Sequence, residues 1–153
     1  MRRRRSGFSF VEMLMAMTVV AILAGIAIPK AGDLIKRARA AVVASEIRAV
    51  RDAVAVYYVD SLSYPPTAAL GQMPPALEPY IGGQVAFIQS GYQLQYNNWT
   101  VHWSMPGYPS TLSIIGVTVH TDDARLGQLV MQVLSSTPHF QWGENYTFIV
   151  VGL

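Results

Sequence analysis

The feature that most constrains this chain is a predominantly apolar run from Phe8 to Ile28, which contains a single ionisable side chain, Glu12. As an α-helix, these residues would span about 31 Å at about 1.5 Å per residue. That length matches the hydrocarbon core of a bilayer, which is about 30 Å thick. Four arginines, residues 2–5, precede the run, separated from it by Ser6 and Gly7. We therefore expect a membrane-spanning helix at residues 8–28.

The carboxylate of Glu12 is the unusual part of this helix. A charged side chain costs roughly 2.5–3.5 kcal/mol at the centre of a membrane helix and less near an interface, so Glu12 needs a partner. Residues 6–12 read Ser-Gly-Phe-Ser-Phe-Val-Glu. This stretch resembles the class III signal of type IV prepilins and type II secretion pseudopilins. The match is strict at Gly7, Phe8 and Glu12, whereas residues 9–11 stand where the family commonly has Thr-Leu-Ile.

The resemblance implies a processing pathway and a structural role. A prepilin peptidase would cleave after Gly7, removing residues 1–7 as a leader, and would methylate the new N-terminus at Phe8. The carboxylate of Glu12 would then pair with the positive terminal amine of a neighbouring subunit, because each charge offsets the desolvation of the other in low dielectric. The chain would be a filament subunit and not an enzyme, and it would need no cofactor.

The same resemblance implies the partners and the location. The partners would be the peptidase/methylase, further copies and other pilin-like subunits, and a membrane assembly platform with its ATPase. The precursor would cross the cytoplasmic membrane once with its C-terminus exported, and the assembled filament would be extracellular or periplasmic. Within the family, a pilus and a type II secretion pseudopilus both remain open.

Other classes of protein also begin with arginines and an apolar run. One alternative is a membrane-anchored ligand-binding protein that does not polymerise. Another is an exported protein, including an exported enzyme, cleaved after a signal peptide at the small residues 25–27. Neither alternative requires a carboxylate at Glu12, and replacing it would leave their function intact.

Charge and cysteine content exclude further classes. The sequence pI of 9.0 is basic, but four of the eleven Lys and Arg residues lie in the expected leader. Without it, seven basic side chains face nine acidic ones, so net charge does not favour a nucleic-acid partner. The chain has no cysteine, so packing, a metal or neighbouring subunits must hold the exported part together.

The apolar run continues into an amphipathic segment at residues 29–60. Gly25 and Pro29 predict a bend or local unwinding, because proline removes one helical hydrogen bond and clashes with the preceding turn. Apolar residues then recur at steps of four and three, which indicates one helical face that packs against a head. This face comprises Val43, Ile47, Val50, Val54 and Tyr57.

The rest of the chain predicts a small β-rich head. Residues 61–91 are rich in Pro and Gly and read as a connecting loop with one helical turn near residues 76–80. Period-two alternation at residues 92–103 predicts a hairpin with its turn at Asn97-Asn98, followed by strands at residues 111–120 and 146–151. The expected fold is α+β, with a long N-terminal helix packed on an antiparallel sheet of about four strands within residues 92–153.

Few residues of the head suggest chemistry. Asp122 and Asp123 predict the N-cap of a helix at residues 124–134. With Glu144, they are also weak candidates for a calcium site such as some pseudopilins have, although no Asp-x-Asp-x-Asp-Gly loop is present. The three histidines are far apart in sequence and predict hydrogen-bonded structural roles rather than a zinc site. The aromatic residues of the head predict core packing over a ligand surface; these are Tyr92, Tyr96, Trp99, Trp103 and Trp142.

Overall fold

The computed structural model describes residues 8–83, 85–105 and 108–152. The chain divides into two compact units, Met1–Ile35 and Lys36–Leu153, and each is described by itself. A single helix, α1 (Phe10–Ser61), begins in the first unit and ends in the second. It continues through Pro29 without interruption. The bend expected at Gly25 and Pro29 stays a prediction.

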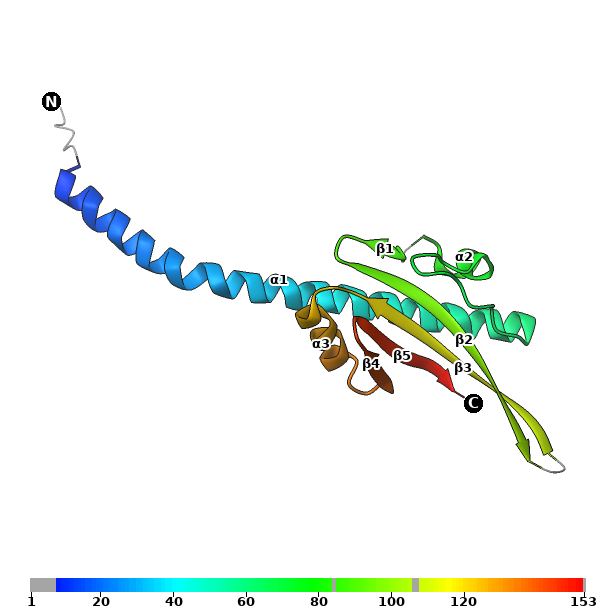
Figure 1. Ribbon diagram of the computed structural model, residues 1–153. Coiled ribbons are helices and arrows are strands. Elements are labelled where there is room, and N and C mark those ends of the chain that lie inside the picture. Colours follow the sequence, from blue (N-terminus) through cyan, green and yellow to red (C-terminus); the bar gives the residue numbers. More distant parts are fainter. Residues whose placement is uncertain (1–7, 84, 106–107, 153) are drawn as a thin grey trace. The chain divides into compact units, whose positions relative to one another are not determined.

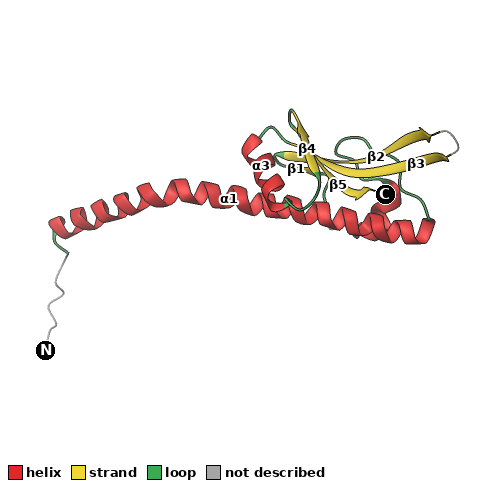
Figure 2. Ribbon diagram, turned by 90° about the horizontal axis from the view of Figure 1, so that it is seen from below, coloured by secondary structure: helices red, strands yellow, loops and turns green. Residues whose placement is uncertain are grey.

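The second unit consists of the C-terminal part of α1 and a five-stranded antiparallel sheet (Figures 1 and 2). The spatial order of the strands is β1-β2-β3-β5-β4. Their bounds are β1 (Ile88–Gln89), β2 (Tyr92–Met105), β3 (Tyr108–His120), β4 (His139–Trp142) and β5 (Asn145–Gly152). The predicted α+β class is confirmed, with five strands where about four were expected: β1 and β4 were not predicted, and the two strands of the predicted hairpin are the single strand β2.

Short helices complete the second unit. The expected helical turn after α1 is present as a 3-10 turn, η1 (Pro75–Leu77), followed by α2 (Glu78–Ile81). The helix α3 (Ala124–Val133) connects β3 to β4. Its N-cap is Asp123, whose carboxylate accepts hydrogen bonds from the backbone N–H groups of Arg125 and Leu126. The helix predicted from the Asp122-Asp123 pair is therefore confirmed.

The prediction of a turn at Asn97-Asn98 is wrong. Both residues lie inside the continuous strand β2, where they pair with Gly116 and Ile115 of β3. Asn97 is buried and donates a side-chain hydrogen bond to Thr118 Oγ1 at 2.9 Å. Asn98 is held by the loop that follows α1, since its side-chain amide donates to the carbonyl of Pro65. Hydrogen bonds to distant partners thus override the local turn preference of asparagine.

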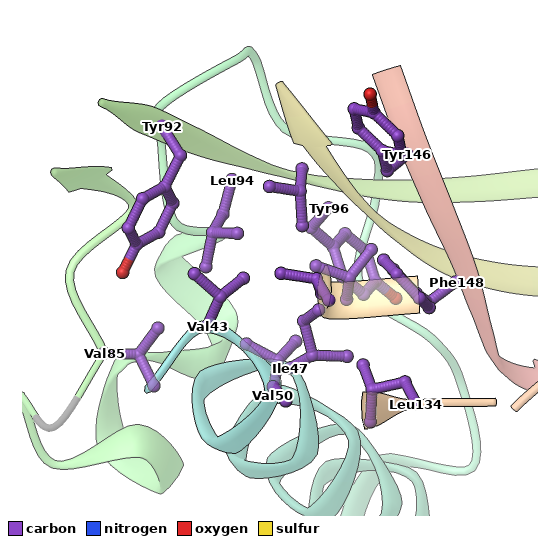
Figure 3. Close-up of a cluster of buried hydrophobic side chains, with 14 of the residues drawn as sticks. Val43, Ile47, Val50, Val85, Tyr92, Leu94, Tyr96, Leu134, Tyr146 and Phe148 are labelled. Carbon is purple, nitrogen blue, oxygen red and sulfur yellow. The ribbon is translucent and has the colours of Figure 1, made fainter. Parts of the chain in front are cut away.

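The core lies between α1 and the sheet, as Figure 3 shows. The α1 residues Val43, Ile47 and Val50 are buried there with residues of β2 and β5, among them Tyr96 and Phe148. Val54 is also buried, and Tyr57 is partly buried against the same cluster. The period of this stripe fixes which side of the helix meets the sheet, and burial of the apolar side chains stabilises that contact.

One carboxylate is buried at the same helix–sheet contact. Glu46 is 6% exposed, and its Oε2 accepts a hydrogen bond from the hydroxyl of Tyr92 at 2.8 Å. Burial raises the pKa of Glu46 above its usual value, and the hydrogen bond from Tyr92 opposes that rise only in part. The folded protein therefore holds a proton on Glu46 more tightly than the unfolded chain does.

The raised pKa of Glu46 predicts that the stability of the fold depends on pH. Because the folded-state pKa of Glu46 is raised, its contribution is complete below the unfolded pKa and is lost as the pH rises through the folded pKa. Glu46→Gln keeps an acceptor for Tyr92 without a charge. We expect it to raise the free energy of unfolding by about 1 kcal/mol at pH 7 and to change it little at pH 4. Denaturant unfolding of the full-length protein in detergent measures both.

The control for this experiment is Glu78→Gln, which changes an exposed carboxylate at the start of α2. That variant should follow the wild-type stability at every pH. Parallel pH curves for Glu46→Gln and the wild type would show that Glu46 carries no shifted titration.

Candidate functional site

The first candidate site is the start of α1. Gly7 and the rest of the expected leader lie outside the described residues, which begin at Phe8. The side chain of Phe8 is 78% exposed. The helix begins two residues later, at Phe10. The expected cleavage bond therefore lies just before the helix, and Glu12 lies in its first turn.

Glu12 and Ser9 form one half of a capping box. The carbonyl of Ser9 accepts the first helical hydrogen bond, from the N–H of Met13 at 3.2 Å, so Ser9 is the N-cap. The backbone N–H of Ser9 donates to Oε2 of Glu12 at 2.9 Å. The Ser-x-x-Glu signature of a capping box stands in the sequence at residues 9–12, and sequence reasoning missed it because it assigned Glu12 only to a neighbouring subunit.

This geometry also fits the electrostatics of a helix start. The N-terminus of a helix carries partial positive charge and unpaired N–H groups, so a carboxylate there is stabilised before it meets any other partner. A carboxylate has two oxygens with about four acceptor positions, so one N–H leaves capacity for a further cation. The arrangement can position the carboxylate of Glu12 at the start of an apolar helix and present it to an amine.

The rest of the first unit presents apolar side chains to its surroundings. By length and composition, α1 is a helix able to cross a membrane, and its most apolar window has 0% of its residues buried. Phe10 and Met17 are 77% and 71% exposed. An apolar surface of this extent needs lipid or other helices around it.

The second candidate site is the acidic group at the start of α3. The Oδ1 of Asp123 accepts the hydrogen bonds that cap α3, and its Oδ2 lies 3.0 Å from Nζ of Lys36. Its hydrogen bond with Lys36 lowers the pKa of Asp123 below the usual value. Calcium requires six to eight oxygen ligands. A calcium site built on Asp122, Asp123 and Glu144 would share Asp123 with the helix cap and with Lys36, and it stays a prediction.

Asp122 instead lies beside a histidine that sequence reasoning treated as structural. Ligand atoms of His120, Asp122 and Glu144 all lie within 4.8 Å of one another. Sequence reasoning grouped Glu144 with Asp122 but did not add His120, because the approach of His120 to Glu144 depends on the pairing of β3 with β5. Of the other histidines, His139 is hydrogen-bonded at Nδ1 to the carbonyl of Thr137, and the side chain of His102 lies outside the described residues.

The aromatic residues of the head divide between core and surface. Tyr92 and Tyr96 are buried, as predicted. Trp142 is 82% exposed and Trp99 is 37% exposed, so the prediction of core packing is wrong for Trp142. Trp142 is the last residue of the edge strand β4. The side chain of Trp103 lies outside the described residues.

Comparison with known proteins agrees with the geometry at the start of α1. The family described as the prokaryotic N-terminal methylation motif matches residues 2–28. The "Type II secretion system core protein G" of Pseudomonas aeruginosa is 30% identical over 66 residues, which are 43% of this chain and 46% of that protein. The chain thus matches about half the length of this curated relative. No solved structure matches. A methylation motif, a pseudopilin relative and a long apolar helix joined to an antiparallel sheet support a likeness of this chain to the type IV pilin and pseudopilin family.

Proposed function

We propose that this protein is a structural subunit of a type IV filament, cleaved after Gly7 and methylated on Phe8. The observation that carries the proposal is the first turn of α1, where the carboxylate of Glu12 stands at the helix N-terminus within the matched methylation motif. An anchor that only holds a protein in the membrane does not need this carboxylate, which is costly in lipid.

The carboxylate of Glu12 also explains how the subunits would assemble. Cleavage after Gly7 creates a positive amine on Phe8, directly before the N-cap Ser9. In a bundle of such helices, the amine of one subunit pairs with Glu12 of the next, and each offsets the desolvation of the other. The exposed apolar side chains of the first unit then pack against helices of other subunits in place of lipid.

The remaining partners and the location follow from this role. The precursor stands in the cytoplasmic membrane with the head exported, and a prepilin peptidase/methylase processes it. Copies of this chain, with other pilin-like subunits, assemble on a membrane platform driven by an ATPase. Between the two systems, the relative named for type II secretion favours a secretion pseudopilus over a pilus.

The N-terminal residue tests this proposal directly. The chain is recovered from membrane and sheared-surface fractions of its own cells, and its N-terminal peptide is identified by mass spectrometry. We expect a peptide that begins with N-methyl-Phe8 in the membrane fraction, and its abundance in the sheared-surface fraction would favour a pilus over a secretion pseudopilus. A chain that begins at Met1 would indicate an uncut anchor, and one that begins near Ile28 an exported protein. Either result would overturn the filament proposal.

A further inference from the structure

A group of potential metal ligands lies on the head, outside the region that the filament proposal uses. His120 ends β3, Asp122 lies in the link from β3 to α3, and Glu144 lies in the turn between β4 and β5. One ligand atom from each lies within 4.8 Å of the other two. Three separate segments therefore bring one imidazole and two carboxylates to the same place.

The sheet holds these segments together. His120 pairs with Asn145 in the register of β3 with β5. The next residue, Thr121, donates its backbone N–H to the carbonyl of Glu144 at 3.1 Å. The backbone positions of the group are thus set by strand pairing, whereas the side chains of Asp122 and Glu144 are exposed and free to rotate. Movements of about 1 Å by such side chains bring the ligand atoms to the spacing of a bound ion.

The imidazole of His120 is oriented for binding. Its Nδ1 lies 3.0 Å from Oδ1 of Asn145. An amide oxygen only accepts hydrogen bonds, so Nδ1 is the donor, and in the neutral imidazole Nε2 then presents its lone pair. Nε2 lies 3.9 Å from Oε2 of Glu144. The neutral ring and the carboxylates can therefore share a cation, and an outer hydrogen bond of this kind is typical of metal-binding histidines.

We propose that His120, Asp122 and Glu144 bind one transition-metal ion of the Zn²⁺ type. Imidazole together with carboxylate suits zinc and similar ions, whereas calcium prefers six to eight oxygens. Three protein ligands leave a fourth position open to solvent or to a ligand from another molecule. The ion would tie the entry to α3 to the β4–β5 turn, in a head that has no cysteine to form a disulfide.

Metal titration of the full-length protein tests the site. The protein, without a histidine tag and in detergent micelles, is stripped with EDTA and titrated with Zn²⁺ at pH 8, where histidine is ordinarily neutral. We expect one ion per chain by calorimetry and a tetrahedral absorption spectrum with Co²⁺. His120→Asn, Asp122→Asn and Glu144→Gln should each weaken binding at least about 100-fold, and Asn145→Ala about 10-fold to 100-fold.

Matched controls separate this site from other binding. His139→Asn removes the described histidine outside the group, and Asp52→Asn removes an exposed carboxylate of α1, so both should bind Zn²⁺ as the wild type does. Absence of binding would overturn the proposal. Binding of Ca²⁺ as tight as that of Zn²⁺, unchanged in His120→Asn, would also overturn it. None of these results depends on whether the chain forms filaments.

Discussion

Glu12→Gln should abolish filament assembly while leaving the start of α1 intact. Glutamine also serves at the third position of a capping box, so the hydrogen bond from the N–H of Ser9 can persist. What the variant lacks is the charge that is proposed to pair with the amine of Phe8 on a neighbouring subunit. Losing one partner of a buried ion pair costs about 3–5 kcal/mol, which is more than a 100-fold change in an association constant. Sheared-surface fractions should then contain no filaments by electron microscopy.

Two comparisons separate the effect of the Glu12 charge from the effects of helix capping and of cleavage of the leader. Ser9→Ala keeps the backbone N–H that Glu12 accepts and keeps the carboxylate, so this control should still assemble. Glu12→Gln should be present in the membrane at the wild-type level, since its helix and its cleavage residues are unchanged. If Glu12→Gln formed filaments as the wild type does, the carboxylate would serve only as a helix cap, and the pairing proposal would fail.

The elements that depend on local patterns were predictable from the sequence. The length of the apolar run and the stripe that includes Val43, Ile47 and Val50 together specify a long helix with one buried face. Asp123 marks the start of α3, because an N-cap needs only its own neighbours along the chain. These features depend on residues that lie within one or a few helical turns of one another.

The elements that depend on distant partners were not predictable. Asn97 and Asn98 resemble a turn until Thr118 and Pro65 supply their hydrogen bonds. The short strand β1 has two residues and too little pattern to be recognised. The candidate metal group required the register that places Glu144 beside His120. The capping box was missed for another reason. Its Ser-x-x-Glu signature lies within residues 9–12, but Glu12 was given only the role that the family resemblance implies.

Gly127→Ala should strongly destabilise the head, although the same change on an exposed helix position stabilises by about 1 kcal/mol. Gly127 lies in the middle of α3, and a β-carbon there would overlap the ring of Tyr146 on β5. Tyr146 is 1% exposed, so its ring has no open space into which it can move. Overpacking of this kind costs about 1–3 kcal/mol. We expect the free energy of unfolding of the full-length protein in detergent to fall by about 2–3 kcal/mol.

The same substitution at a second glycine provides the comparison. At Gly116 of β3, an added β-carbon would lie 2.6 Å from the end of the Trp99 side chain. Trp99 is 37% exposed and can turn toward solvent, so Gly116→Ala should cost less than Gly127→Ala. The double variant Gly127→Ala/Tyr146→Leu should lose less free energy of unfolding than the sum of the losses in the two single variants. The smaller side chain at position 146 makes room for the added β-carbon. A stabilising Gly127→Ala would mean that α3 does not pack on β5 at this distance, and the position of the Asp122 link beside Glu144 would then lose its support.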